Sequence, residues 1–256
     1  MDTETAMRLA ALTSEFYVQR AASFSATRDH PWPGWKTCLP YIENLIHAEG
    51  PAYPPSQSSH RVLDLACGNL RFFDYLHERF PAVSWTYHGI DNAEAMVPAG
   101  GQIQTLDIMS ALFRGDLASQ LPTAPVDLSV CFAFLHHVPL QDLRRQVVQT
   151  LVNQGRPGGL VIFTAWQFAR DPVRKAKAEA TTSRAAERLA LTGLSEGDYL
   201  LGWQNNDDAL RYCHSLSDPE IDDIISAVAS QAQPISRFRA DGKTNTLNTY
   251  VILQVN

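Results

Sequence analysis

The stretch Arg61-Val62-Leu63-Asp64-Leu65-Ala66-Cys67-Gly68-Asn69-Leu70-Arg71-Phe72 decides the fold. Its β-prone apolar residues lead to Asp64, small residues follow as a turn, and a helical pattern begins near Leu70. A strand, a tight turn and a helix in this order form the ligand-binding end of an open parallel α/β sheet. Unpaired N–H groups at the helix start and a turn of small residues let a ligand approach the backbone. The dinucleotide fingerprint G-x-G-x-x-G does not fit, because Gly68 is the only glycine of this turn.

The composition, with 45% hydrophobic and 19% charged residues, is that of an ordinary globular protein. At 256 residues the chain is long enough for one α/β domain. The formal net charge of −6 disfavours whole-surface attraction to nucleic acid but leaves a local basic patch open. The chain has four cysteines, Cys38, Cys67, Cys131 and Cys213. They lie far apart in the sequence and have no C-x-x-C spacing, so we expect neither a zinc site nor a disulfide framework. No apolar run approaches the ~20 residues of a membrane span, and Asp2 and Glu4 argue against a secretory signal. We therefore expect a soluble, cytoplasmic protein without a membrane partner.

Two further predicted strands end on acids. Residues 83–91 end on Asp91, which follows Asp64 by 27 residues, and residues 102–108 finish near Asp107. That interval is close to the one at which α/β nucleotide folds place an acid on the ribose hydroxyls. A carboxylate suits this position because it accepts two hydrogen bonds from a vicinal diol. A lone aspartate after a strand can equally be a helix cap.

The other predicted elements follow from periodicity and breakers. Residues 5–22 and 37–48 have helical spacing, and between them Trp32 and Trp35 lie in or beside a loop at 31–34. That loop is either pinned to the core or acts as a lid over the crevice. The later pattern predicts a connector at 51–59, strands at 126–134, 160–166 and 211–214, helices at 140–153, 170–190 and 218–230, a turn at 156–159, loops at 191–210, and a hairpin of 235–239 with 247–255.

Two features allow both a structural and a functional interpretation. The helix at 170–190 is basic within an acidic chain, and is either a solvated face or a surface for a polyanion. His136 and His137 follow the apolar strand at 126–134. Consecutive residues rarely face one ion, and no third ligand is near in the sequence, so we predict no metal. Without a metal, the two histidines either shape a pocket or donate a hydrogen bond to a substrate.

The pattern from Asp64 to Leu70 resembles the D-x-G-x-G-x-G motif of class I S-adenosylmethionine methyltransferases, with Ala66 and Leu70 in place of two glycines. The resemblance implies an α/β fold: a seven-stranded Rossmann-like sheet, mostly parallel with a C-terminal antiparallel hairpin and helices on both faces. It implies S-adenosylmethionine as cofactor, held by Asp64, Ala66, Gly68, Asp91, Asn92, Asp107, Ile108 and Phe132. We expect one domain over 1–256, with a helical lid and connector (1–59), a cofactor core (60–168), a substrate region (169–232) and a closing hairpin (233–256).

Three segments resemble signatures of the tRNA wobble-uridine carboxymethyl methyltransferases. Residues 24–33 resemble F-S-x-T-R-x-x-P-W-P, residues 135–137 resemble I-H-H, and residues 211–214 resemble R-Y-Y-H. That family esterifies a carboxymethyl group on C5 of uridine, and its eukaryotic members work with a small zinc-binding activator protein. The resemblance implies catalytic roles for Arg28, His136, Arg211 and His214, and substrate contacts for Trp32, His137 and Trp203.

Carboxylate methylation suits this set of residues. The nucleophile is already ionised at neutral pH, so the site must chiefly align the reacting atoms and remove water. Arginine suits such an anion because its planar fork binds a carboxylate bidentately. Two alternatives stay open: a small-molecule O-methyltransferase acting on a natural product or metabolite, and a binding protein with the methyltransferase fold but no catalysis. The expected partners are tRNA and an activator protein in the first case and a small-molecule substrate in the second.

Overall fold

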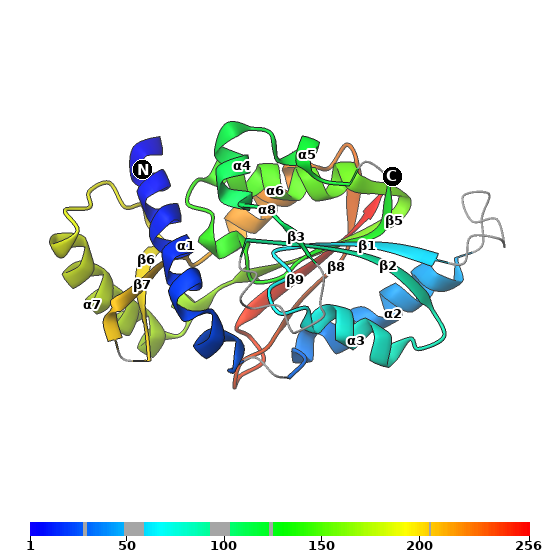
Figure 1. Ribbon diagram of the computed structural model, residues 1–256, viewed down its shortest axis with the longest axis horizontal. Coiled ribbons are helices and arrows are strands. Elements are labelled where there is room, and N and C mark those ends of the chain that lie inside the picture. Colours follow the sequence, from blue (N-terminus) through cyan, green and yellow to red (C-terminus); the bar gives the residue numbers. More distant parts are fainter. Residues whose placement is uncertain (28–29, 49–58, 93–102, 123–124, 205) are drawn as a thin grey trace.

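The computed structural model describes residues 1–27, 30–48, 59–92, 103–122, 125–204 and 206–256. Its centre is a seven-stranded sheet in the order β3-β2-β1-β4-β5-β9-β8 (Figure 1). The strands are β1 (Ser59–Leu65), β2 (Ser84–Asp91), β3 (Gln104–Thr105), β4 (Val126–Cys131), β5 (Gly155–Trp166), β8 (Ala232–Ala240) and β9 (Asn248–Val255). The first five are parallel, and β9 runs antiparallel to both β5 and β8. This confirms the predicted sheet and its closing hairpin.

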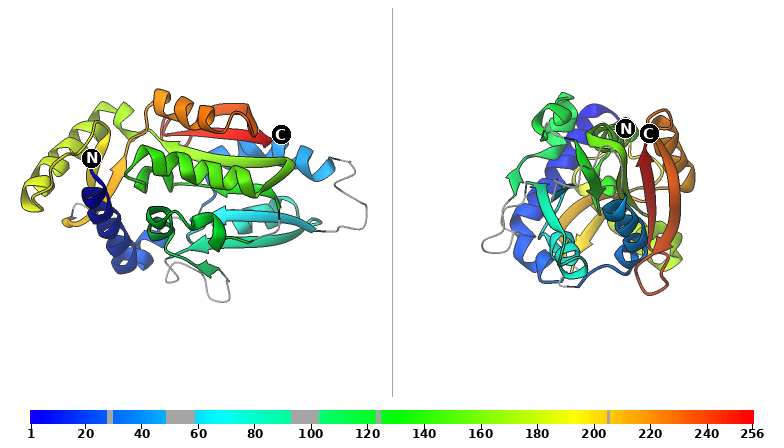
Figure 2. Two further views of the ribbon diagram at one scale, coloured as in Figure 1. Left: turned by 90° about the horizontal axis from the view of Figure 1, so that it is seen from above. Right: turned by 90° about the vertical axis from the view of Figure 1, so that its right-hand side faces the viewer.

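Helices cover both faces of this sheet (Figures 1 and 2). One face carries α2 (Pro33–His47) and α3 (Arg71–Arg79), and the other carries α4 (Ile108–Arg114), α5 (Leu117–Gln120), α6 (Gln141–Gln154) and α8 (Asp218–Ala227). Successive side chains of β1 point to opposite faces of the sheet, so this strand contributes to the core on both faces. Val62 packs with α2 and α3, while Leu63 and Leu65 pack with the α4–α8 side. All three side chains are fully buried.

A second sheet of two antiparallel strands, β6 (Asp198–Trp203) and β7 (Asn206–His214), lies at the end of the main sheet where its parallel strands finish (Figure 1). It packs between α1 (Thr3–Ser25) and α7 (Pro172–Arg188). The prediction of loops over 191–210 holds for residues 191–197, which form neither helix nor strand, and is wrong for the residues of β6 and for 206–210 of β7. Tyr199 and Leu200 are both buried, on opposite faces of β6. A short strand buried on two sides lacks the apolar–polar alternation that marks a strand.

Three further local predictions need correction. The third strand is only Gln104–Thr105, because Asp107 accepts from the Ser110 N–H (2.9 Å) and starts α4. The predicted turn at 156–159 lies within β5, where Gly158 has φ +75°. The loop at 31–34 is shorter than expected, since Pro33 occupies the first turn of α2. The predicted connector lies, except for Ser59, outside the described residues.

Two 3₁₀ turns extend the strands at the site: η2 (Leu135–His137) after β4 and η3 (Phe168–Arg170) after β5. Within the described residues, no helix is long and apolar enough to cross a membrane.

Candidate active site

The turn after β1 has an alternating left-handed backbone. Ala66, Gly68 and Leu70 have φ values of +64°, +56° and +60°. These are the three positions at which the D-x-G-x-G-x-G motif has glycine, the residue that takes such angles at least cost. The N–H groups of Ala66 and Cys67 both donate to the Ile90 carbonyl, at 2.8 and 3.1 Å. The turn thus keeps the conformation of the motif although two of its glycines are absent.

Two buried acids flank this turn. Asp64 is the last residue but one of β1 and accepts from the Tyr87 hydroxyl. Its burial raises the pKa of its carboxyl to about 7. Asp91 ends β2, is 6% exposed, and accepts from the Gly68 N–H at 2.8 Å. A buried carboxylate is stabilised by a positively charged or hydroxyl-bearing neighbour. Both acids therefore suit a ligand with an ammonium group and a diol.

A cavity of about 1110 Å³ opens beside these acids. It lies at the carboxyl ends of β1, β2 and β4, the position at which open α/β sheets bind ligands. All the predicted cofactor residues line it: Asp64, Ala66, Gly68, Asp91, Asn92, Asp107, Ile108 and Phe132. Asp107 is also a helix cap, because its two carboxylate oxygens accept from the Ser110 N–H and hydroxyl. The two interpretations of that aspartate are thus compatible.

The opposite wall of the same cavity comes from distant segments. Of the predicted substrate and catalytic residues, Trp32, His136, His137 and Arg211 line it, and so does Tyr17 of α1. Trp32 stacks on Trp35 with ring centroids 5.7 Å apart. The start of α2 is fixed because the Gly34 N–H donates to the buried Asp241 at 2.9 Å. Arg28 lies outside the described residues.

Arg211 is a buried cation in this wall. The residue is only 7% exposed, and its guanidinium lies over the adjacent rings of Phe16 (4.9 Å) and Trp203 (5.5 Å). Its hydrogen bond to the Gly202 carbonyl is long, at 3.5 Å. Among the described residues, no carboxylate lies within ion-pair distance of it. Trp203 does not itself line the cavity; it packs against Arg211, which corrects its predicted substrate contact.

His137 has a partner on each ring nitrogen. Nδ1 lies 2.8 Å from the Tyr212 carbonyl oxygen, and Nε2 lies 2.8 Å from the Tyr17 hydroxyl. A carbonyl only accepts, so Nδ1 carries the proton, and in the neutral ring Nε2 accepts from the Tyr17 hydroxyl. The orientation of His137 is thus set by β7 and α1 together.

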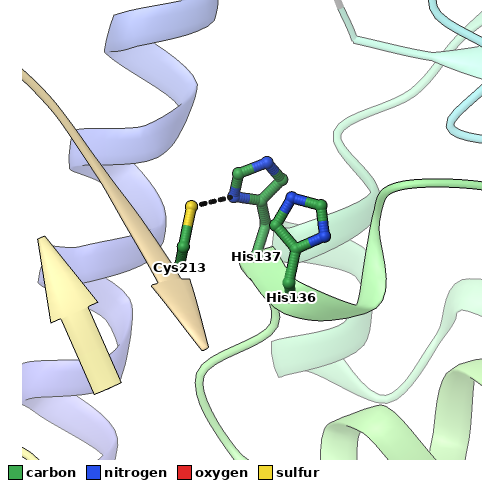
Figure 3. Close-up of side chains that lie close together, drawn as sticks. All are labelled: His136, His137 and Cys213. Carbon is green, nitrogen blue, oxygen red and sulfur yellow. Dashed lines mark hydrogen bonds between the residues drawn. The ribbon is translucent and has the colours of Figure 1, made fainter. Parts of the chain in front are cut away.

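The expectation that no third metal ligand is near the histidine pair is wrong. Strand β7 brings Cys213 beside them, and one ligand atom of each of His136, His137 and Cys213 lies within 4.8 Å of the others (Figure 3). However, the His137 atom nearest the Cys213 sulfur is Nδ1 (3.8 Å), whose proton bonds to Tyr212. Burial also raises the pKa of the Cys213 thiol to about 12. In this arrangement Nδ1 of His137 has no lone pair for a metal and the Cys213 thiol is protonated, and metal-free catalysis stays a prediction.

His214 does not line the cavity, which corrects its predicted catalytic role. Its Nδ1 lies 2.7 Å from Asp198 and its Nε2 lies 2.8 Å from Glu220. Both partners are carboxylates and only accept, so both nitrogens carry protons and the ring is an imidazolium. Arg144 also donates to Glu220, and the Tyr212 hydroxyl donates to Asp198. His214 therefore holds β7, the strand of Arg211, against β6 and α8.

The sequence analysis missed Tyr17 and Asp241 as residues of the cavity. Tyr17 falls within residues 5–22, whose spacing predicts a helix, and an aromatic residue on such a helix is expected to pack in the core. Asp241 has φ +67° in the turn between β8 and β9, where an aspartate is ordinary. Neither residue carries a local signal for a site, since only the packing of α1 and the hairpin brings them to it.

Comparison with known proteins finds a methyltransferase domain within the chain. Residues 62–159 match the methyltransferase domain family. A solved methyltransferase from Methanosarcina mazei, described as S-adenosylmethionine-dependent, has the same fold at 16% identity, with a TM-score of 0.55 over 79% of this chain and 97% of that one. A protein of Encephalitozoon cuniculi that carries a provisional methyltransferase name is 28% identical over 78% of this chain and 77% of its own length.

The tRNA (carboxymethyluridine(34)-5-O)-methyltransferase of Arabidopsis thaliana is 25% identical over 57% of this chain. The match spans only 30% of that longer protein. The matched residues therefore carry a methyltransferase domain, and together with the sheet order and the acids around the cavity these matches support S-adenosylmethionine as its cofactor.

Proposed function

We propose that the chain methylates a carboxylate, and that its substrate is the carboxymethyl group of wobble uridine in tRNA. The observation that carries the proposal is Arg211, a buried guanidinium in the cavity wall that packs on two aromatic rings and has no carboxylate partner among the described residues. A buried charge without a counter-charge is costly. An anionic substrate group removes that cost on binding.

The chemistry of a carboxylate acceptor fits the remaining residues of the wall. When bound, S-adenosylmethionine supplies a methyl group on a positively charged sulfur. A carboxylate oxygen forms the new bond to that carbon while the bond from carbon to sulfur breaks, and the two opposite charges neutralise. No proton is transferred, so a neutral His137 suffices as a hydrogen-bonding wall residue. The site must align the reacting atoms and exclude water.

The cofactor's polar groups match the acids on the other wall. Asp64 would face the ammonium group of the methionine moiety, which would stabilise its ionised form against burial. Asp91 would accept from the ribose hydroxyls with the oxygen that is not bonded to the Gly68 N–H. Ile108 and Phe132 offer apolar surface for the adenine.

The tRNA substrate is supported by the three sequence signatures and by the names of the partial relatives in Arabidopsis thaliana and Mus musculus. A zinc-binding activator protein and a cytoplasmic location belong to the same proposal. One observation favours a second candidate, a small carboxylic acid of metabolism: the net charge of −6 gives the whole protein no general attraction to RNA.

The deciding experiment is incubation of the purified protein with methyl-labelled S-adenosylmethionine and, separately, with tRNA carrying carboxymethyluridine and with a small-molecule extract. We expect base-labile label in the tRNA, as a methyl ester requires. Alkali-stable label would contradict a carboxylate acceptor. Label in the small-molecule fraction alone would replace tRNA by the second candidate.

A further inference from the structure

Three arginine side chains from two separate segments converge on one carboxylate, away from the residues assigned to the reaction. Arg170 of η3 and Arg237 and Arg239 of β8 all donate to Asp218, the first residue of α8. Arg237 and Arg239 bond to it at 3.0 and 3.1 Å. A second carboxylate, Asp222, pairs with Arg237. Three cations therefore meet two anions, and one positive charge is in excess.

The cluster is open to solvent. The side chains of Arg170, Arg237 and Arg239 are 40%, 32% and 43% exposed. Ion pairs of this exposure contribute at most about 1 kcal/mol each, so their members exchange partners at little cost. A phosphate binds an arginine fork through two parallel hydrogen bonds, as a carboxylate does. An incoming phosphate can thus be bound by guanidinium groups that now share Asp218.

Two chain segments connect the cluster to the cavity. Arg239 lies two residues before Asp241, which lines the cavity, a distance of about 7 Å along a strand. Arg170 lies four residues after Trp166, which also lines it. Arg237 and Arg239 point to the same face of the edge strand β8, since Phe238 between them stacks on Tyr250 on the other face.

We infer that Arg170, Arg237 and Arg239 bind phosphates of the RNA strand that flank the nucleotide held in the cavity. This inference rests on the proposed function, because a nucleotide in the cavity must continue into a chain of phosphates outside it. It assigns the phosphate contact to the β8 edge and to η3, which directly precedes the basic helix α7. The occupant is the backbone of a single RNA strand, recognised by charge without regard to base.

The test compares Arg237→Gln/Arg239→Gln with the parent on two substrates: an anticodon stem-loop RNA carrying carboxymethyluridine at the wobble position, and the carboxymethyluridine nucleoside. Binding of the stem-loop is measured over a series of salt concentrations. We expect roughly tenfold weaker binding at about 0.1 M salt, and a salt slope smaller by about 1.4 to 1.8 for two lost phosphate contacts. Methylation of the nucleoside, which has no phosphate, should stay at the parent rate.

Arg145→Gln is the matched control. Arg145 is 37% exposed and pairs with Asp223 and Asp142, so it is similarly accessible but has no excess positive charge around it. It should leave RNA binding and the salt slope unchanged. Thermal melting checks the fold of each variant. If the double variant is unfolded, Arg239→Gln alone, which leaves Arg170 and Arg237 on Asp218, should give half the change in slope.

The outcomes separate the inference from the function. A double variant that binds and methylates the stem-loop as well as the parent overturns the inference and leaves the proposed function standing. A parent that methylates neither the stem-loop nor the nucleoside overturns the proposed function, and the inference with it. Loss of stem-loop binding with an unchanged salt slope would assign the arginines a structural role and also overturn the inference.

Discussion

The two walls of the cavity are built in opposite ways. The cofactor wall comes largely from one short stretch, β1 and its turn, with the ends of the neighbouring strands. The acceptor wall brings together Tyr17 of α1, His137 of η2 and Arg211 of β7. Tyr17 and His137 are 120 residues apart and yet bonded. The first wall depends on local backbone geometry, and the second depends on how separate elements pack.

Because the two walls are built differently, we expect substitutions in them to affect the binding of different ligands. If the cofactor wall binds as proposed, through backbone N–H groups and short acids that the strands position, single changes should weaken one ligand group at a time. The acceptor wall depends on β7, whose residues bond to α1 and η2 and are held by His214. Changes there should affect the acceptor and spare the cofactor.

The largest effect is expected from Arg211→Ala. Loss of a charged, desolvated hydrogen-bonding group costs about 3 kcal/mol, so kcat/KM for the acceptor should fall about 100-fold. Calorimetry should give unchanged affinity for S-adenosylmethionine. Arg211→Lys keeps the charge without the planar fork and should recover only part of the loss. Weaker cofactor binding in Arg211→Ala would show that the two walls are not separate.

Asp91→Ala should produce the reverse pattern. Removing an acceptor of charged hydrogen bonds costs about 1.5–3 kcal/mol, so S-adenosylmethionine should bind more than tenfold more weakly. The KM for the acceptor should change little. The measurement is calorimetry on a variant whose melting confirms its fold. Unchanged affinity would remove Asp91 from the cofactor site.

The acceptor wall should respond to pH through His214. Burial lowers the pKa of His214, but hydrogen bonds to Asp198 and Glu220 outweigh it and raise the pKa above 6.5. Its contribution to folding is therefore complete below pH 6.5 and is lost as the pH rises through the raised pKa. Burial raises the pKa of Glu220, but its hydrogen bonds, led by that from His214, bring it down to about 2. Its contribution is complete above pH 4.5 and is lost as the pH falls toward 2.

We therefore expect the contribution of the His214–Glu220 pair to the free energy of unfolding to be greatest between about pH 4.5 and 6.5, and to fall on the alkaline side by at most about 1.4 kcal/mol per pH unit. Urea titrations of the parent and of His214→Gln at a series of pH values measure this contribution as the difference between the two proteins, in which the fall due to the buried Asp64 cancels. The difference should shrink as the pH rises above 6.5, and the acceptor KM of His214→Gln should rise while cofactor affinity holds. A difference that does not change with pH on the alkaline side would contradict the role of His214.

Cys213→Ser should have a small effect. The thiol is buried and protonated, so a hydroxyl of similar size should keep most of the activity. We also expect activity to survive prolonged chelation, with no zinc by elemental analysis of the purified chain. Stoichiometric zinc that Cys213→Ser abolishes would show that the cluster in Figure 3 rearranges to bind a metal.

The smallest change is expected from Ala66→Gly. Glycine relieves the strain of φ +64° but adds freedom to the unfolded chain, so stability should rise by no more than about 1 kcal/mol. Cofactor affinity should stay the same, because the turn already has the required conformation. A marked gain in affinity would show that Ala66 distorts the cofactor wall. Thermal melting and calorimetry together decide this.

The sequence by itself determined the sheet and the cofactor wall, because both follow from neighbours along the chain. Alternation and apolar runs mark β1, β2 and β4, and the acids that end β1 and β2 fall at a regular interval. Parallel strands then bring those ends to one edge. The motif pattern located the turn even where Ala66 and Leu70 replace its glycines, since both residues keep the left-handed φ angles of the motif.

Only the tertiary structure decided the acceptor wall and the role of each residue in it. Arg211 and His214 are three residues apart on β7, yet one lines the cavity and the other joins a buried ion-pair network. Their side chains point to opposite faces of the strand, and the sequence gives no sign of which face meets the cavity. Cys213 likewise contacts His137 only because β7 packs against η2. Tyr17 contacts His137 only because α1 packs there as well. Contacts between segments so far apart have no local pattern, and therefore the packing of the whole chain sets them.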